Sequence, residues 1–135
     1  METLDRTNPN QLSPLTLAFI GDAVYELLVR ERLVNEANRQ SKKLHSESVK
    51  LVNAAAQSQA AEKLLPLLTE EETAVYRRGK NAHVAHFPKG ATAMQYNMAT
   101  GLESLFGWLY LCGKADRINE LFSEITGTKA NEFDA

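Results

Sequence analysis

The stretch LAFIGDAVYELLVR, residues 17–30, decides the fold of this chain. It lies within a longer apolar run that starts after Ser13 and Pro14, an N-cap residue followed by proline at the first helical position. The run continues to about Val34 and is apolar around most of a helix. Such a run predicts a long helix in the centre of a domain built from helices.

Four more helices are expected in the rest of the chain, joined by short connections. Thr69 and Glu72 have the spacing of a capping box, and Gly113 is placed to end a helix as a C′ residue. No alternating pattern typical of strands occurs, so the predicted fold class is all-α. The expected helices run from about Leu44 to Leu65, where Pro66 interrupts, from about Glu70 to Asn81, from about Met94 to Cys112, and through a last amphipathic segment before Gly127.

Composition indicates one globular domain covering residues 1–135, because a chain of this length buries about two-thirds of its unfolded surface on folding. Hydrophobic residues make up 44% and charged residues 24%, which excludes a disordered chain. No signal or transit peptide is visible, and the longest apolar stretch is too short to span a bilayer. The lone Cys112 cannot form an internal disulfide, so the cytoplasm is the expected location.

Two acids stand out because each lies in an apolar helix. Asp22 shares a helical stripe with apolar residues and is therefore expected to face the interior, and Glu103 is the only charged residue between Lys89 and Lys114. A carboxylate removed from water costs several kcal/mol, so it must find a cation, collect hydrogen-bond donors or take up a proton. Two such acids on neighbouring helices can share one cation.

Magnesium is the predicted cation, because it takes oxygen ligands, keeps several waters and binds through one or two carboxylates. Gly21, Gly101 and Gly107 would let the two helix backbones approach closely. The alternative is that each acid is salt-bridged or hydrogen-bonded without a metal and that the glycines serve packing alone. Glu26, one turn beyond Asp22, is a further ligand, a base beside the site or an acid paired with Arg30.

The overall charge of −2 gives no hint of a nucleic-acid partner, but the charges are unevenly distributed. Between Thr73 and Leu102 every charged residue is basic, and residues 82–92 predict an ordered basic loop. Such cations recognise the backbone of duplex RNA, while the alternative is a solvated basic face at a helix C-terminus. His83 and His86 are weak candidates for zinc, and Cys112 is expected to be a packed thiol. The predicted RNA-binding residues are Arg77, Arg78, Lys80, Asn81 and Lys89.

Three segments carry a resemblance to a known family. LAFIGDAVYELLVR resembles the signature helix of the ribonuclease III superfamily, and TGLESLFGWLYL, residues 100–111, resembles its second acidic helix. EEETAVYRRGKNA, residues 70–82, and the short length resemble the Mini-ribonuclease III branch, which has the nuclease domain without a double-stranded-RNA-binding domain. The resemblance covers nearly the whole chain and implies a ribonuclease III-type helical bundle.

Matched residue by residue, the signature aspartate falls on Asp22 and the acid of the second helix on Glu103. These are the two acids that the burial argument selected, and the resemblance implies that both are catalytic and bind metal. Full-length members have two further acids, at the positions of Ala18 and Thr100 here. The Mini branch shares this reduced set, which argues against a permanent second metal ion.

The resemblance also implies an activity and partners. It implies a homodimer with an active site from each chain, magnesium-dependent cleavage of double-stranded RNA to 5′-phosphate and 3′-hydroxyl ends, and maturation of 23S ribosomal RNA precursor in bacteria. A ribosomal protein would be a partner that shapes the substrate. Two competing classes remain, namely a non-catalytic RNA-binding or ribosome-associated scaffold with the same fold and an all-helical interaction module without RNA affinity.

Overall fold

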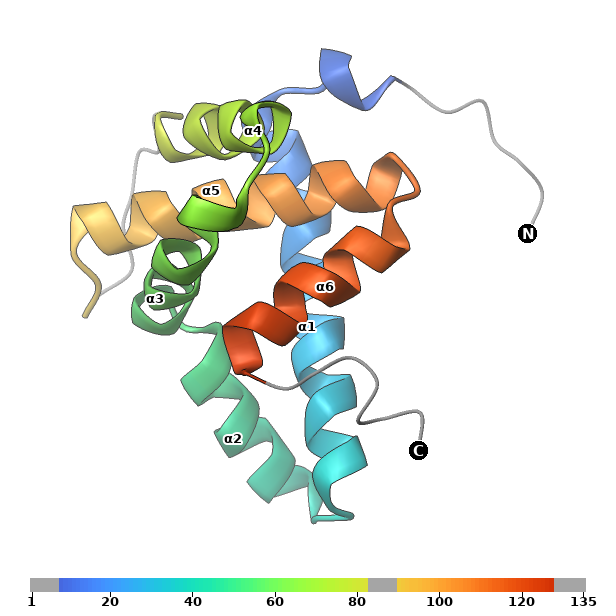
Figure 1. Cartoon of the computed structure of the whole chain (residues 1–135). Coiled ribbons are helices and arrows are strands. Elements are labelled where there is room, and N and C mark those ends of the chain that lie inside the picture. Colours follow the sequence, from blue (N-terminus) through green and yellow to red (C-terminus); the bar gives the residue numbers. More distant parts are fainter. Residues whose placement is uncertain (1–7, 83–89, 128–135) are drawn as a thin grey trace.

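The computed structural model describes residues 8–82 and 90–127. Within these ranges the secondary structure is entirely helical, which confirms the predicted all-α class (Figure 1). The elements are the short 3-10 turns η1 (Pro9–Gln11) and η2 (Leu65–Leu67) and the helices α1 (Pro14–Glu36), α2 (Ser41–Val52), α3 (Ala54–Leu64), α4 (Glu70–Lys80), α5 (Ala93–Leu111) and α6 (Ala115–Thr126).

Helix α5 is the centre of the bundle, as its apolar sequence predicts. It packs most extensively on α1, α4 and α3, and α6 folds back onto the core (Figure 1). The side chains of Leu105, Phe106 and Leu109 on α5 are completely buried. Because hydrophobic burial contributes roughly 25 cal/mol per Å² of apolar surface, this helix is the main source of stability in the fold.

The sequence signals for helix starts are found in the structure. The Ser13 hydroxyl accepts a hydrogen bond from the Thr16 backbone N–H, and Pro14 begins α1. Thr69 and Glu72 form the predicted capping box at the start of α4. A second capping box, formed by Thr92 and Gln95 at the start of α5, was not predicted. These caps satisfy backbone donors that would otherwise be left without partners.

The prediction of one helix from about Leu44 to Leu65 was wrong, because two helices meet at Asn53. Asn53 ends α2 in an extended conformation, and its side chain accepts a hydrogen bond from the Ala56 N–H at 2.8 Å. An asparagine that caps a new helix in this way overrides the helix propensity of the alanines that follow. The predicted interruption at Pro66 is confirmed as the turn η2.

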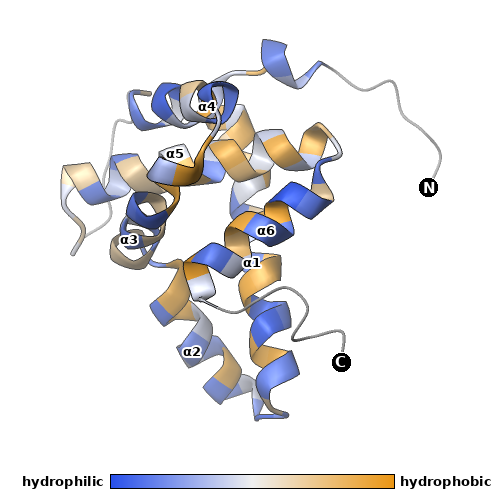
Figure 2. Ribbon diagram, viewed as in Figure 1, coloured by the Kyte–Doolittle hydropathy of each residue, from blue (hydrophilic) through white to orange (hydrophobic). Residues whose placement is uncertain are grey.

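Helix α1 is less buried than its sequence predicts. Tyr25 is buried and packs edge-on against Phe106 at 5.4 Å between ring centroids, but the opposite side of α1 exposes 84% of Phe19 and 65% of Leu27. Helix α5 packs on the side of α1 that carries Tyr25, and Figure 2 shows apolar residues interspersed with polar ones along α1. None of the described helices combines the length and the apolar character that a membrane span requires.

Candidate functional site

The site is built where the backbones of α1 and α5 touch. A Cβ atom added to Gly21 would lie 1.7 Å from the carbonyl oxygen of Glu103, and one added to Gly107 would lie 2.0 Å from that of Leu17. Side chains larger than hydrogen are therefore excluded at both positions. The close approach predicted for these two glycines is confirmed, and it brings the residue after Gly21 beside Glu103.

Gly101 has a different role from the one predicted. A Cβ atom at this position would lie 2.8 Å from the ring of Tyr76, so Gly101 makes room for α4 rather than for α1. Gly79 of α4 lies opposite, with an added Cβ 3.0 Å from the Gly101 Cα atom. The sequence could not distinguish these contacts, because neighbouring positions on one helix face different partners.

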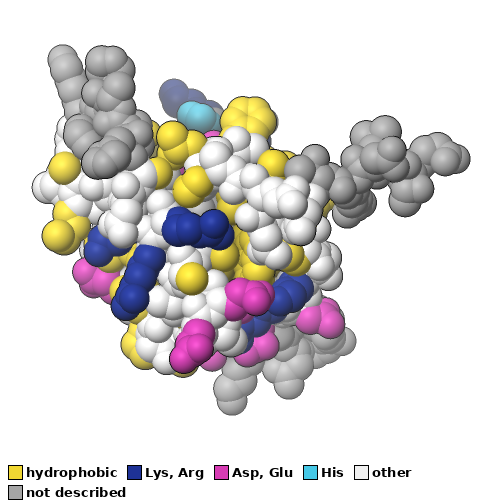
Figure 3. Space-filling model, turned by 90° about the horizontal axis from the view of Figure 1, so that it is seen from above, with side chains coloured by type: hydrophobic (Ala, Val, Ile, Leu, Met, Phe, Trp, Pro, Cys, Tyr) yellow, Lys and Arg dark blue, Asp and Glu magenta, His cyan; other side chains and the backbone are white. Residues whose placement is uncertain are grey.

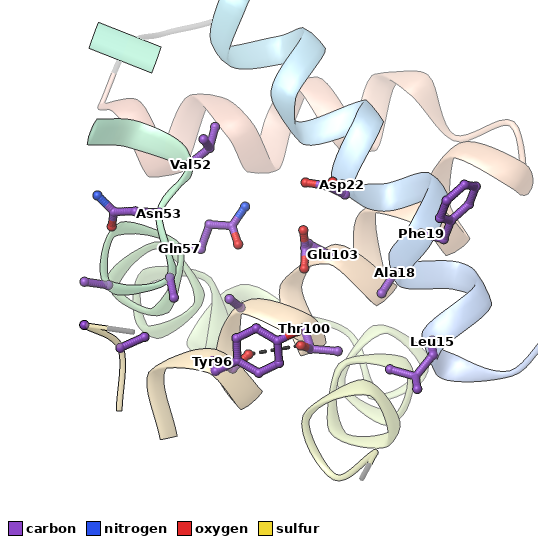
Figure 4. Close-up of a pocket in the computed structure, with 15 residues that line it drawn as sticks. Leu15, Ala18, Phe19, Asp22, Val52, Asn53, Gln57, Tyr96, Thr100 and Glu103 are labelled. Atoms are coloured by element: carbon purple, nitrogen blue, oxygen red, sulfur yellow. Dashed lines mark hydrogen bonds between the residues drawn. The ribbon is translucent and has the colours of Figure 1, made fainter. Parts of the chain in front are cut away.

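Asp22 and Glu103 line one pocket between α1, α3 and α5 (Figure 4). The structure thus brings together the two acids that the sequence singled out. Asn53, Gln57 and Tyr96 also line this pocket, although the sequence analysis did not select them. The remaining lining residues are Leu15, Ala18, Phe19, Val52, Ala54, Ala55, Gly90, Ala91, Ala99 and Thr100.

Asp22 does not face the interior, so that prediction was wrong. Its side chain is exposed at the pocket, and Leu15, on the same predicted stripe, is 44% exposed. Successive residues of an α-helix are about 100° apart, and it is Gly21 that touches α5, so Asp22 falls at the edge of the contact. Glu103 is the more buried of the two acids.

The two carboxyl groups interact directly. Burial raises the pKa of Glu103 to about 8, and its hydrogen bond to Asp22 and the charge of Asp22 act in the same direction. At neutral pH and without a cation, Glu103 therefore tends to keep its proton. Neither acid forms an ion pair with any residue in the described ranges, so the salt-bridge alternative is not supported.

The two positions at which full-length family members have further acids lie in the same pocket. Ala18 and Thr100 both line the pocket, and the Thr100 hydroxyl donates to the backbone carbonyl of Tyr96 at 3.0 Å. Among the described residues, no group of three or more His, Cys, Asp or Glu side chains is arranged to hold a metal ion. Two neighbouring carboxyl groups fit one hard cation that keeps most of its water ligands.

Glu26 and Cys112 have structural roles outside the pocket. Glu26 forms an ion pair with Arg30 at 2.7 Å and does not line the pocket, which matches the paired-acid alternative. Cys112 is half-buried and packs against the core, and burial raises the pKa of its thiol. A thiol with a raised pKa is a poor nucleophile at neutral pH.

The predicted RNA-binding residues gather at the end of α4. Arg77 and Arg78 are exposed, Lys80 is half-buried, and Asn81 is the exposed C-cap. None of the three cations forms an ion pair within the described part of the chain. Figure 3 views the side on which α4 lies and shows Lys and Arg side chains interspersed with acids. Lys89, His83 and His86 lie outside the described residues.

Comparisons with known proteins identify the family of this chain. The family model described as Ribonuclease III domain matches residues 15–114, which include both acids. A Mini-ribonuclease 3 from Symbiobacterium thermophilum is 46% identical over 84% of this chain and 88% of its own length. One from a Thermoanaerobacter species is 43% identical over 89% of this chain and 84% of its own length.

A solved structure supports the fold independently. The crystal structure of a protein from Fusobacterium nucleatum is similar with a TM-score of 0.82 at 31% identity, covering 90% of this chain and 98% of that one. The family implied by the three sequence segments is therefore confirmed. The chain belongs to the ribonuclease III family of endoribonucleases and, within it, to the Mini-ribonuclease 3 group.

Proposed function

We propose that this endoribonuclease hydrolyses double-stranded RNA with a magnesium ion held by Asp22 and Glu103. Enzymes of the ribonuclease III family act on double-stranded RNA and generally depend on a divalent metal. The observation that carries the proposal is the meeting of the two acids, from helices far apart in the sequence, in one pocket without a protein cation among the described residues.

The two acids have different tasks in this proposal. When bound, magnesium would lower the pKa of a water molecule and stabilise negative charge on the phosphate. Asp22 is exposed and can contact an ion that arrives from solvent with its water ligands. Glu103 is more buried and would hold the ion as a carboxylate, with its proton lost to solvent, because a nearby positive charge favours the ionised form. Hydrolysis would leave a 5′-phosphate and a 3′-hydroxyl.

Binding of the RNA backbone is assigned to the end of α4. Arg77, Arg78 and Lys80 are not neutralised by described acids, so they can contact phosphates. Asn81 adds a side-chain amide at the same helix end, and Lys89 is assigned from the sequence alone. These residues would supply affinity, since recognition of duplex RNA depends mostly on phosphate and 2′-hydroxyl contacts.

The exposed side of α1 supports the homodimer. Phe19, Leu27 and Val34 are 84%, 65% and 55% exposed, and apolar side chains gathered on one helix favour a protein interface. Phe19 also lines the pocket, so this interface would lie next to the acids. Phe19→Asp should yield a monomer in sedimentation velocity, and an unchanged dimer would place the interface elsewhere.

We assign the enzyme to 23S ribosomal RNA maturation in the bacterial cytoplasm, with a ribosomal protein assisting.

One observation favours a second candidate function, a non-catalytic RNA-binding scaffold. Ala18 and Thr100 leave the pocket with two carboxylates where full-length members have four. Incubation of the pure protein with duplex RNA, in magnesium or in EDTA, decides between the candidates. Cleavage in magnesium alone supports the enzyme, binding without cleavage supports the scaffold, and no affinity for RNA leaves only an interaction module.

A further inference from the structure

Gln57 lies on the wall of the pocket opposite the two acids. It is one turn inside α3, after the cap at Asn53, and is only 3% exposed. In Figure 4 its amide group is directed across the pocket toward Asp22 and Glu103. A buried amide that is aimed at a pair of acids is placed to act on whatever the acids hold.

Gln57 differs from the other buried polar residues. Ser48 and Ser58 donate to backbone carbonyls within their own helices, and Ser104 donates to the carbonyl of Pro14. Thr100 and Glu72 also have partners. Among the described residues, the side chain of Gln57 makes no hydrogen bond, and its amide is not sealed off as the Tyr76 hydroxyl is but faces the space of the pocket.

An amide that packs among apolar side chains gives up part of its hydration, which costs free energy unless a partner in the pocket replaces the lost water. A leucine of similar volume would fill the same space beside the alanines of α3 without that cost. The polar group in this position therefore indicates a ligand in the pocket rather than a packing requirement.

The chemistry of the carboxamide fits a hydrated cation. Its oxygen accepts hydrogen bonds from water and its nitrogen donates two, and amide oxygens are also accepted ligands of hard cations. A magnesium ion with two carboxylate ligands keeps several water molecules, which need acceptors. In this pocket Ala18 cannot provide one, whereas the amide oxygen of Gln57 can, and so can the hydroxyl of Thr100, which donates to the Tyr96 carbonyl and keeps its lone pairs.

We propose that Gln57 is a third, neutral member of the metal site, a positioning residue whose carboxamide hydrogen-bonds the water ligands of the ion held by Asp22 and Glu103. This inference rests on the proposed function, because it requires that the two acids bind magnesium. It assigns part of the role of the missing carboxylates to a group on a different helix. Residues that orient the ligands of a metal in this way are typically worth 10- to 100-fold in metal affinity or activity.

The test is magnesium affinity measured without RNA, by isothermal titration calorimetry and by the rise of the melting temperature with magnesium concentration. Gln57→Leu should bind magnesium about 10- to 100-fold more weakly, with metal-free stability equal to or above that of the wild type. Gln57→Glu, which adds a third carboxylate, should bind it more tightly. Gln59→Leu is the matched control, because Gln59 is on the same helix but is exposed.

A purely structural role predicts the opposite pattern. In that case Gln57→Leu changes stability and leaves magnesium affinity at the wild-type value, which overturns the inference. The parent proposal fails separately, when Asp22→Asn retains wild-type magnesium affinity and cleavage. Weak magnesium binding by Asp22→Asn together with unchanged binding by Gln57→Leu would refute the role of Gln57 alone.

Discussion

Gly21→Ala tests the contact on which the site is built. The added Cβ would lie 1.7 Å from the oxygen and 2.6 Å from the carbon of the Glu103 carbonyl, whereas carbon atoms pack at about 3.5–4.0 Å. The backbones of α1 and α5 would have to move apart by roughly 1.5 Å or more. Overpacking of this kind lowers the unfolding free energy by about 1–3 kcal/mol. The upper end applies here, because both contacting groups belong to helix backbones and cannot rotate away as a side chain can.

The higher helix propensity of alanine offsets about 1 kcal/mol of that cost. The expected net loss is therefore about 2 kcal/mol, or roughly 6–8 °C in melting temperature for a domain of this size. Because the separated helices carry Asp22 and Glu103, magnesium affinity should also fall. Circular dichroism during heating and calorimetric titration measure the two effects.

Two further variants make the test specific. Gly107→Ala should lower the unfolding free energy by a similar amount, since its Cβ would lie 2.0 Å from the Leu17 carbonyl oxygen in the same contact between α1 and α5. Gly113→Ala is the control, because its Cβ meets nothing within 4 Å and its cost comes only from a φ of 75°. That cost is about 1–2 kcal/mol, without a change in magnesium affinity. Wild-type stability of Gly21→Ala would refute the close contact.

Three other predictions concern charge. The Arg117 guanidinium lowers the pKa of Glu72, so the stabilisation from this pair is complete above the ordinary value of 4.5 and is lost as the pH falls through the lowered pKa. Arg117→Met should lower the unfolding free energy at neutral pH by about 3 kcal/mol, the low end for a buried ion pair because Arg117 is partly exposed, and should remove its acid-sensitive part. An unchanged pH profile would contradict the pairing. Magnesium binding at about pH 7 should release close to one proton, because the pKa of Glu103 is raised to about 8. Calorimetry at one pH in buffers of different ionisation enthalpy measures this release, and a binding heat that is the same in every buffer would contradict it. Reversing the charges of Arg78 and Lys80 should weaken duplex RNA binding and flatten its salt dependence in filter binding, and an unchanged salt slope would place the RNA surface elsewhere.

The sequence predicts the core of this fold well because the signals that determine it are local. The continuous apolar run of α5 can be buried only in the centre, and the pairs Ser13–Pro14 and Thr69–Glu72 satisfy backbone donors within one turn. The break at Asn53 was missed because the alanines after it favour a continuous helix. The side-chain hydrogen bond of Asn53 decides the outcome.

The candidate site was only half predictable. Asp22 and Glu103 were found because an acid in an apolar helix requires a partner, and the structure brings them together. The exposure of Asp22 depends on which of two neighbouring residues touches α5, and a helical stripe is too coarse to decide that. No sequence pattern indicates Gln57, because its position opposite the two acids depends on how α3 packs against the other helices.

The most direct test of the central claim is the turnover of Asp22→Asn on duplex RNA in magnesium, beside Glu26→Gln. Both variants neutralise an acid on α1 and are one turn apart, but Glu26 is paired with Arg30 and does not line the pocket. Asp22→Asn should still bind the duplex but no longer cleave it, while Glu26→Gln should cleave at nearly the wild-type rate. Wild-type turnover by Asp22→Asn would contradict the assignment of the metal site.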